Sequence, residues 1–429
     1  MIVTIAFLIL FALLLLRTPI AAATGLVGIG GLAVYQGIGP ALSQIGIIAT
    51  ETVLTYEFAV IPLFILMGAF ISRSGIAEEL YRACHALVGH RRGGLAVATV
   101  IACGGFGAVC GSSLATAATM SRVAYPPMKK YGYSDALASG SIAAGGTLGI
   151  LIPPSIALVF YGILTETDIG QLFIAGLLPG MVGILLYAAA VVAVTTLDRK
   201  AGPAADRLPL GERLKALRDV WATGLLFVIV MGGIYGGFFS PTESAGIGAV
   251  GALLITAARG RASLAMVRDA LTDAAHTTVA LIAILIGAFL FANLINVASV
   301  PQALVAWIGA MDVPPLVVIL AIIGVYLVLG CVLESMSMML LTVPVFYPLV
   351  ASLGYDLIWF GIVVVVVTEI SLITPPIGLN VFVLRAVLPD VRLASVFRGV
   401  MPFIAADVVR LALILFVPWL SLALPQLMR

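Results

Sequence analysis

Residues 140–162 read GSIAAGGTLGILIPPSIALVFYG, and this apolar stretch has two adjacent prolines, Pro153 and Pro154, at its centre. A diproline removes two backbone donors, so the carbonyl groups one turn earlier lose their helical partners. In the hydrocarbon of a membrane, such unpaired backbone is tolerated only where protein covers it or where it lines a wet cavity. The stretch therefore predicts a membrane helix that is interrupted where ions or substrate are held.

A second copy of this arrangement occurs later in the chain. Gly132-Tyr133 precedes Pro153-Pro154 by 21 positions, and Gly354-Tyr355 precedes Pro375-Pro376 by the same number. An offset of 222 relates these motifs and two further pairs, and an offset of 223 relates another: Tyr125-Pro126 with Tyr347-Pro348, Gly111-Ser112-Ser113 with Leu333-Glu334-Ser335, and Gly176-x-x-Pro179 with Gly399-x-x-Pro402. Motifs that recur in order predict an internal repeat. Interrupted apolar segments at matching places of two halves are typical of a transporter binding site.

The composition indicates a membrane protein. Hydrophobic residues make up 62% of the 429 residues and charged residues only 10%, whereas soluble domains carry roughly a quarter charged residues. The net charge of +2 gives no reason to expect a nucleic-acid partner. Residues 1–16 lack a basic region and a small-residue cleavage site, so we expect a retained membrane segment there and no signal peptide.

The apolar segments predict an all-α polytopic membrane protein with about ten transmembrane helices and two re-entrant hairpins. Eight segments approach the length of roughly 20 residues that a spanning helix needs: residues 1–16, 19–36, 51–71, 171–197, 220–239, 243–258, 276–297 and 399–424. Two interrupted helices, residues 135–164 and 356–388, complete the ten. The hairpins are residues 93–130, too long for one span and basic at both ends, and residues 315–350, with Glu334 at the tip.

These segments divide the chain into five parts. Residues 1–92 and 220–314 are expected to be scaffold helices, and residues 93–197 and 315–429 are the two transport repeats. Residues 198–219 form the one long polar connection and contain six Lys and Arg residues. We interpret this connection as a cytoplasmic loop between the halves and as a candidate amphipathic helix on the membrane surface.

The basic residues predict an orientation. With Arg17 placed in the cytoplasm, the inner loops contain 19 of the 22 Lys and Arg residues, and the outer loops between spans contain none. By the positive-inside rule both termini are then periplasmic. The first hairpin would open to the inside and the second to the outside. The repeats are therefore expected to be inverted, which fits alternating access.

Each hairpin tip, with the interrupted helix opposite it, predicts one sodium site. Unwound carbonyls and half-helix C-termini suit a hard cation, while half-helix N-termini suit a carboxylate. The first site consists of two hydroxyl residues and the backbone of the facing helix: Ser112, Ser113, Gly146, Thr147, Gly149 and Ile152. The second consists of Glu334, Ser335, Thr368, Ser371, Thr374 and Gly378. The candidates for substrate contact are Ser155, Asn380 and Arg122.

Structural interpretations of these residues remain open. A Gly-Ser-Ser sequence alone more often serves close helix packing, and a single diproline can be a simple kink. Their recurrence in both halves favours a site. Glu334 and Glu369 are costly to bury, so each either coordinates a cation or pairs with a basic side chain.

Three other charged positions also allow a structural role. Asp407 and Arg410 are spaced three residues apart on one helix and predict an ion pair. Arg122 could meet an anionic substrate, extend toward the membrane surface, or pair with a carboxylate. Glu243, after Pro241-Thr242, predicts a helix cap.

The sequence does not indicate an enzyme. His85, His90 and His276 are isolated, and the four cysteines lack metal-ligand spacing. The G-x-x-x-x-G-K pattern for nucleotide phosphates is absent. No cofactor is therefore expected, and an ion gradient is the expected source of energy.

The chain resembles, over nearly its whole length, the large membrane subunit of tripartite ATP-independent periplasmic (TRAP) transporters. The resemblance is carried by six stretches: Pro62–Gly68, Gly111–Thr116, Ile152–Ile156, Leu172–Gly180, Pro241–Glu243 and Ile373–Asn380. Pro241-Thr-Glu-Ser-Ala245 departs at one position from the usual Pro-Thr-Glu-Ala-Ala of the family.

The resemblance implies an elevator-type, sodium-coupled importer of organic anions in a bacterial inner membrane. C4-dicarboxylates, sialic acids and similar carboxylates are the implied substrates. It also implies two partners, a small four-helix membrane subunit and a periplasmic binding protein that delivers the substrate. The nearest alternative is a stand-alone sodium–dicarboxylate symporter of related architecture, and an anion channel is a more distant one.

Overall fold

The computed structural model describes residues 2–311 and 313–427, and all regular structure within those residues is helical. In chain order the elements are α1 (Ile2–Leu15), α2 (Ile20–Gln36), α3 (Ile38–Leu54), η1 (Tyr56–Ala59), α4 (Val60–Ser74), α5 (Ile76–Val88), α6 (Gly94–Cys110), α7 (Ser113–Lys130), α8 (Asp135–Thr147), η2 (Leu148–Ile150), α9 (Ile156–Thr165), α10 (Ile169–Leu197), α11 (Leu210–Asp219), α12 (Trp221–Tyr235), α13 (Pro241–Ala258), α14 (Leu264–Val297), α15 (Val300–Ala310), α16 (Pro315–Gly330), α17 (Ser335–Ser352), α18 (Leu357–Ile373), α19 (Leu379–Val387), α20 (Leu393–Phe416) and α21 (Trp419–Leu427).

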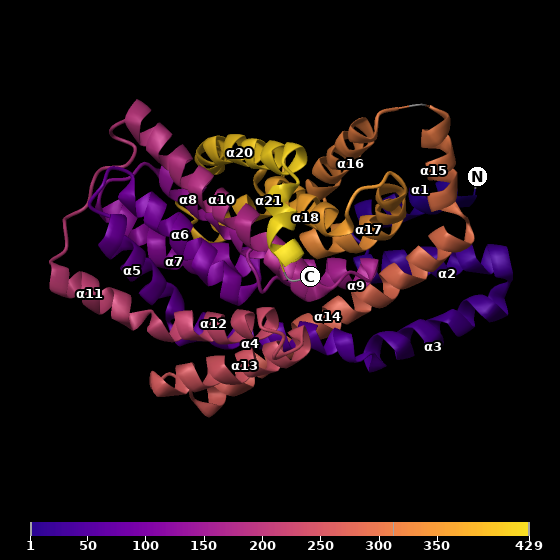
Figure 1. Cartoon of the computed structure of the whole chain (residues 1–429), viewed down its shortest axis with the longest axis horizontal. Coiled ribbons are helices and arrows are strands. Elements are labelled where there is room, and N and C mark those ends of the chain that lie inside the picture. The colour runs from indigo at the N-terminus through magenta and orange to yellow at the C-terminus, as the bar shows by residue number, and fades with distance from the viewer. Residues whose placement is uncertain (1, 312, 428–429) are drawn as a thin grey trace.

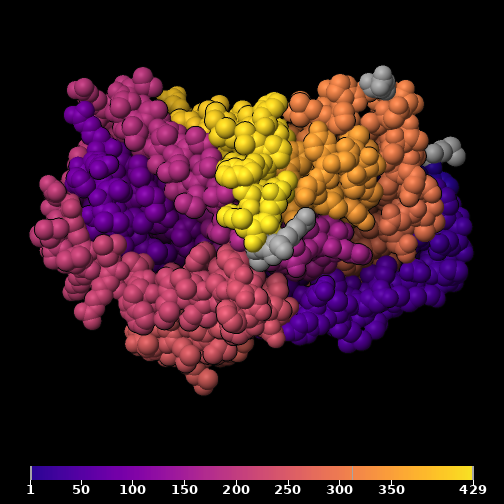
Figure 2. All heavy atoms as spheres, in the orientation of Figure 1, coloured from indigo at the N-terminus to yellow at the C-terminus, as the bar shows by residue number. Residues whose placement is uncertain are grey.

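The helices form two layers in Figure 1. The lower layer contains α2, α3, α4, α12, α13 and α14, all of them from the two predicted scaffold parts. The upper layer contains the hairpins, the interrupted helices and α20. In Figure 2 the C-terminal segment fills the middle of the visible face, between first-repeat and second-repeat elements. This placement agrees with the packing of α20 against α8 and α10 of the first repeat.

The repeat inferred from a few motifs extends through the helices. Shifting α2 by 222 residues gives 242–258, which almost coincides with α13. The same shift relates every helix of the first half to one in the second: α1 to α12, α2 to α13, α3 and α4 together to α14, α5 to α15, α6 to α16, α7 to α17, α8 to α18, α9 to α19 and α10 to α20. The chain is therefore two copies of one helical unit, joined through α11.

The two copies pack against each other reciprocally. In the scaffold, α2 lies along α14 and α4 lies along α13, and each pair is the repeat image of the other. The same holds above it, where α9 contacts α17 and α7 contacts α19. Reciprocal contacts of this kind mark an approximate two-fold relation between two units.

Local capping explains why several helices begin inside the apolar protein. Ser112, Ser155 and Glu334 each precede a half-helix, and each side chain accepts a hydrogen bond from a backbone N–H of the first turn. Such caps satisfy donors that have no partner within the helix. They allow α7, α9 and α17 to start without water.

Two of the predicted spans are interrupted. Residues 51–71 were expected as one helix, but α3 ends at Leu54, and Thr55 is extended with its hydroxyl bonded to the Glu51 carbonyl. The last segment, residues 399–424, breaks after Phe416, because a residue that precedes a proline, here Pro418, disfavours helical backbone. Helices α5 and α15 were not predicted, and α3 before Glu51 and the end of α21 after Leu424 lie outside the predicted spans.

Helix lengths fit a polytopic membrane protein. Six helical stretches are long and apolar enough to cross a membrane: Tyr56–Ser74, Ile169–Leu197, Leu210–Tyr235, Leu264–Val297, Ser335–Ser352 and Leu393–Phe416. Several shorter apolar helices, including α6, α9, α16 and α18, accompany them. The total of ten spans and the inverted orientation of the repeats stay predictions.

Candidate functional site

The first hairpin turns between α6 and α7 at Gly111, whose φ of +67° favours glycine. A side chain at Gly111 would contact Ile156 and the carbonyl oxygen of Pro154, so the hairpin tip lies directly against the first helix break. Deeper in the hairpin, Gly107 of α6 meets Gly149 of η2 backbone to backbone. In the structure, this hairpin tip therefore faces an interrupted helix.

The first break separates α8 from α9 and contains most of the predicted first sodium site. Gly146, Thr147 and Gly149 are buried at the end of α8 and in η2. The Thr147 hydroxyl donates to the Ala144 carbonyl at 2.8 Å, which leaves the lone pairs of its oxygen as acceptors. Ser113 is buried at the first turn of α7, beside its neighbour Ser112.

Two residues of this break have clear structural partners. The Ile152 side chain packs against Gly104 of α6 and Gly180 of α10, so only its backbone can face a ligand. Ser155 caps α9 by accepting from the Leu158 N–H at 3.2 Å, and its hydroxyl donates to the Ile150 carbonyl. Its hydrogen-bonding capacity is therefore largely used by the protein.

The second hairpin repeats this geometry. Its tip lies near the second break, where the Cys331 sulfur is 3.9 Å from the Pro375 carbonyl oxygen. A side chain at Gly330 of α16 would overlap Ser371 of α18, and Ser371 is the repeat equivalent of Gly149. Close contact between the first limb of a hairpin and the facing interrupted helix is therefore common to both halves.

Three hydroxyl groups of the second predicted site, all on or next to α18, donate to carbonyl groups of that helix. Thr368 donates to Val364 at 2.8 Å, Ser371 to Thr368 at 2.7 Å and Thr374 to Ile370 at 2.6 Å. Each oxygen thus keeps acceptor capacity, which is what a hard cation requires. Gly378 begins α19 with a φ of +62°.

Glu334 is used as a helix cap. Its Oε2 atom accepts from the N–H groups of Met336 and Ser337 at 3.0 and 3.3 Å, at the start of α17 beside Ser335. A carboxylate at a helix N-terminus is stabilised by the helix dipole. The structure therefore gives Glu334 a structural partner, while its second oxygen takes no part in this cap.

Asn380 and Arg122 are the two remaining candidates for substrate contact, and only Asn380 forms a hydrogen bond between the two repeats. Asn380 of α19 donates to the Ala143 carbonyl of α8 at 3.1 Å, and its Oδ1 atom is buried with no hydrogen-bond partner among the described residues. The second interrupted helix therefore touches the first. Arg122 is exposed on α7, and it forms none of the ion pairs found in residues 2–311 and 313–427. Pairing of Arg122 with a carboxylate is thus not observed.

A fully buried ionic cluster lies between the two interrupted helices. Arg410 of α20 pairs with Glu369 of α18 and, at 2.8 Å, with Asp407 of its own helix, as its spacing predicts. The Tyr187 hydroxyl of α10 donates to Asp407 at 2.5 Å and lies 3.5 Å from the Thr147 hydroxyl. Gly183 of α10 leaves the space for the guanidinium.

The buried chain Thr147–Tyr187–Asp407–Arg410–Glu369 joins equivalent points of the two repeats. Thr147 and Glu369 are 222 residues apart, so the chain starts and ends at matching positions of the interrupted helices. Sequence reasoning identified the two carboxylates and the arginine but missed Tyr187. A single tyrosine in an apolar helix has no distinguishing pattern, and only the fold reveals its partners.

Two surface carboxylates have structural roles. Lys129 at the end of α7 donates to Asp135 at the start of α8 at 2.6 Å and lowers the pKa of this carboxyl, with Tyr125 contributing in the same direction. Glu243 accepts from the Ser240 N–H at 2.8 Å in a capping box, and this bond lowers the pKa of Glu243. The predicted cap is confirmed.

Residues 7–420 match the family described as "Tripartite ATP-independent periplasmic transporter, DctM component". The chain belongs to this family. It is a TRAP large permease subunit, and the motifs at the first hairpin tip and at both helix breaks are among those that carried the resemblance. Relatives in this family are transporter permeases, not enzymes.

Relatives of the TRAP permease differ in their named substrates. The chain is 39% identical over 378 residues to the C4-dicarboxylate TRAP transporter large permease protein DctM of Pseudomonas aeruginosa, covering 88% of each chain. It is 36% identical to the ectoine/5-hydroxyectoine permease UehC of Ruegeria pomeroyi, covering 86% of this chain and 85% of that one. It is 32% identical to the sialic acid permease SiaM of Vibrio cholerae, covering 87% of each.

A solved structure shares the fold. The YdaH transporter of Alcanivorax borkumensis superposes with a TM-score of 0.64 over 91% of this chain and 90% of that one, at 16% sequence identity. At this identity the similarity concerns the fold alone.

Proposed function

We propose that this TRAP permease is a secondary importer that couples the entry of an organic anion to sodium. The observation that carries the proposal is the pairing of each hairpin tip with an interrupted helix, at repeat-related positions. Interrupted helices expose carbonyl oxygens and helix termini, and these are the groups that bind ions and anionic substrates within a bilayer.

The two predicted sodium sites remain the preferred assignment. At the second site three hydroxyl oxygens keep free lone pairs beside a break in the backbone, which suits a hard cation. The first site offers Ser113, Thr147 and the backbone of η2. For substrate we favour Asn380, because its buried Oδ1 atom has no hydrogen-bond partner among the described residues, over the capping residue Ser155.

The substrate class is proposed from the relatives. C4-dicarboxylates are named for the first relative, and sialic acid and ectoine for others. All three carry a carboxylate, which helix N-termini can bind. We favour a C4-dicarboxylate.

The family name also supports two partners, a small membrane subunit and a periplasmic binding protein. We propose that both act with this chain in a bacterial inner membrane, with both termini periplasmic. In this arrangement the hairpins and interrupted helices move as an elevator against the scaffold layer.

We further infer a role for the buried ionic chain within this mechanism. It connects equivalent positions of the two interrupted helices, so it would hold their cation sites at a fixed separation while the transport elements move. A buried charge pair is poor evidence of stabilisation by itself, but it can specify one arrangement.

Reconstitution in liposomes tests the proposed function. Succinate uptake should require an inward sodium gradient, the small subunit and the binding protein loaded with substrate. Uptake without the binding protein would favour a stand-alone symporter, and sodium-independent currents would favour a channel.

A variant at the first site makes the test residue-specific. Ser113→Ala removes one candidate oxygen and should raise the sodium concentration needed for half-maximal uptake by about tenfold, if one ligand contributes roughly 1.4 kcal/mol. Ser43→Ala, an exposed hydroxyl on α3, is the matched control. An unchanged sodium dependence in Ser113→Ala would reject this assignment.

A further inference from the structure

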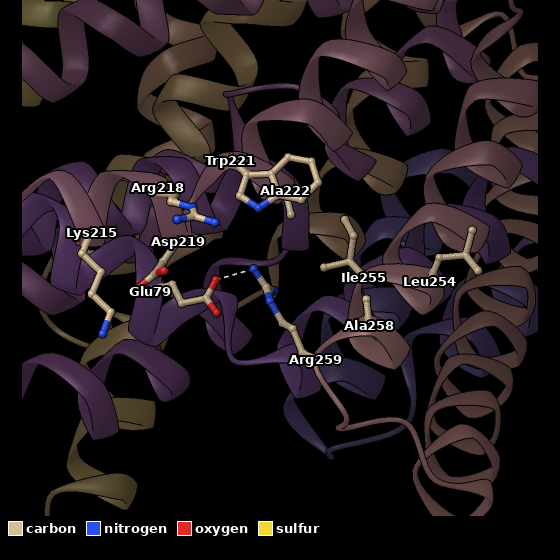
Figure 3. A pocket seen from close by; sticks show the side chains of 10 residues that line it. All are labelled: Glu79, Lys215, Arg218, Asp219, Trp221, Ala222, Leu254, Ile255, Ala258 and Arg259. Carbon is tan, nitrogen blue, oxygen red and sulfur yellow. Dashed lines mark hydrogen bonds and ion pairs between the residues drawn. The ribbon is translucent and has the colours of Figure 1, made fainter.

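A pocket of about 670 Å³ lies where α11 continues into α12, and none of its lining residues belongs to a hairpin tip or helix break. Figure 3 shows Glu79 and Arg259 on one side, with Trp221 and Ala222 opposite. The walls come from α5, α11, α12 and the end of α13. The predicted transport function uses none of these residues.

The pocket lies at a boundary between polar and apolar sequence. Helix α11 has the polar sequence LGERLKALRD with only Ala216 buried, whereas α12 contains no charged residue. The apolar helix α13 ends at the same pocket with Ala258, and Arg259 follows it. Because α12 begins and α13 ends at this pocket, we place the pocket at the membrane–water interface. Tryptophan, here Trp221, is enriched at that interface.

The polar wall of the pocket carries excess positive charge. Arg259 pairs with Glu79, and Arg82 lies 3.9 Å from Asp219, so each carboxylate already has an arginine. Lys215 and Arg218 form none of the ion pairs found among the described residues, and both are exposed. Arg259 also has a buried Nη1 atom with no hydrogen-bond partner among the described residues. The wall therefore offers donors to an anion.

The opposite wall is apolar and continues along the outer surface. Leu254 and Trp221 are 63% and 64% exposed, although both belong to apolar helices. Val228 and Val250 extend this exposed apolar surface along α12 and α13. A ligand that matches both walls has an anionic head and a hydrocarbon chain.

We propose that this pocket binds the headgroup of an anionic phospholipid, with an acyl chain along α12 and α13. The phosphate would lie between Lys215, Arg218 and the free Nη1 of Arg259, and Trp221 would lie at the level of the glycerol. Clusters of basic residues next to a membrane helix attract anionic lipids in this way. Since α11 joins the two repeats, the lipid would fix this joint at the membrane surface.

Native mass spectrometry of the full chain tests the proposal, with phosphatidylglycerol and phosphatidylcholine of identical acyl chains as probes. The double variant Lys215→Gln, Arg218→Gln should weaken phosphatidylglycerol binding by about 25-fold, since each cation near an anionic surface contributes roughly fivefold. Arg199→Gln with Lys200→Gln removes two exposed cations of the connecting loop outside the pocket, and we expect this control to change the affinity by less than twofold.

Further variants and probes distinguish a loss of charge from misfolding, and a lipid from free phosphate. The exchange Lys215→Arg, Arg218→Lys keeps the charge and should retain binding, which excludes simple misfolding as the cause of a loss. If the wild-type protein bound phosphatidylcholine as tightly as phosphatidylglycerol, the proposal would be overturned. The proposal would also be overturned if Arg199→Gln with Lys200→Gln lost as much phosphatidylglycerol affinity as the pocket variant. A third contrary result would be displacement of the lipid by inorganic phosphate at a concentration that leaves the thermal stability of the protein unchanged.

Discussion

At the scale of single residues, the first hairpin tip and the second helix break depend on backbone conformations that few side chains adopt. Gly111 and Gly378 have φ values of +67° and +62°, and each directly precedes a half-helix or its cap. The effect of the diprolines could be predicted from the sequence, because a proline lacks a backbone N–H and clashes with the carbonyl group one turn earlier. The glycine conformations were not, because a glycine in an apolar stretch can equally serve close packing.

Gly378 provides a prediction at this scale. Gly378→Leu should lower sodium-driven uptake strongly, because a branched side chain in the left-handed region costs about 1–2 kcal/mol and the Ile373 carbonyl group lies 3.3–3.4 Å from the added Cβ. Gly378→Asn should retain more activity, since asparagine tolerates this region. Uptake in proteoliposomes measures both, and equal loss in the two variants would show that backbone conformation is not the cause.

The Asp135 carboxyl predicts a dependence of stability on pH. Its pKa is lowered in the folded protein, chiefly by Lys129, so the contribution is fully present above the unfolded pKa of about 3.9. It is lost as the pH falls through the lower folded pKa. The melting temperature of wild type should therefore exceed that of Asp135→Asn at pH 6, and the difference should shrink toward pH 3. A difference that stays constant with pH would contradict this.

At the scale of helices, the local sequence predicted the positions of the interrupted helices better than it predicted the scaffold helices. The amphipathic helix α5 contains Glu78, Glu79 and Arg82, and α3 contains Gln44 and Glu51, so neither reads as an apolar span. Their partners explain the polar positions: Gln44 accepts from Asn293 of α14 at 3.1 Å. Such pairings depend on which helices become neighbours, which no single segment specifies.

Close approach between α8 and α20 gives a prediction at the helix scale. Gly140 and Gly399 face each other, and a Cβ at Gly399 would overlap the Ala136 carbonyl oxygen. Gly399→Ala should therefore destabilise the protein by about 1–3 kcal/mol, the usual cost of overpacking, even though alanine favours helix. Gly324→Ala in α16, where an added Cβ meets nothing within 4 Å, should be neutral or stabilising by up to about 1 kcal/mol. Thermal unfolding in detergent distinguishes the two, and the same sign for both variants would argue against this close packing.

At the scale of the whole molecule, the buried ionic chain links the repeats. Tyr187→Phe removes one hydroxyl between Thr147 and Asp407 and leaves Asp407 without its neutral donor, at a cost of about 1–3 kcal/mol. We expect the variant to fold and to lose sodium-driven uptake beyond what this destabilisation explains.

Tyr161→Phe is the matched control for this test. Tyr161 is equally buried and donates to the Leu357 carbonyl at 2.6 Å, but it lies outside the buried chain. Sodium dependence of uptake should change in Tyr187→Phe and stay unchanged in Tyr161→Phe. Equal behaviour of the two variants would mean that the chain supports the fold and has no part in coupling.

The reciprocal packing of the scaffold also has a consequence for biosynthesis. Since α2 lies along α14 and α4 along α13, these two helices of the first half emerge from the ribosome with their main contact surfaces uncovered. These helices reach their final neighbours only after roughly the next two hundred residues have been synthesised and inserted. Because these contact surfaces are complementary, two separately expressed halves, cut between residues 198 and 209, should assemble in the same membrane.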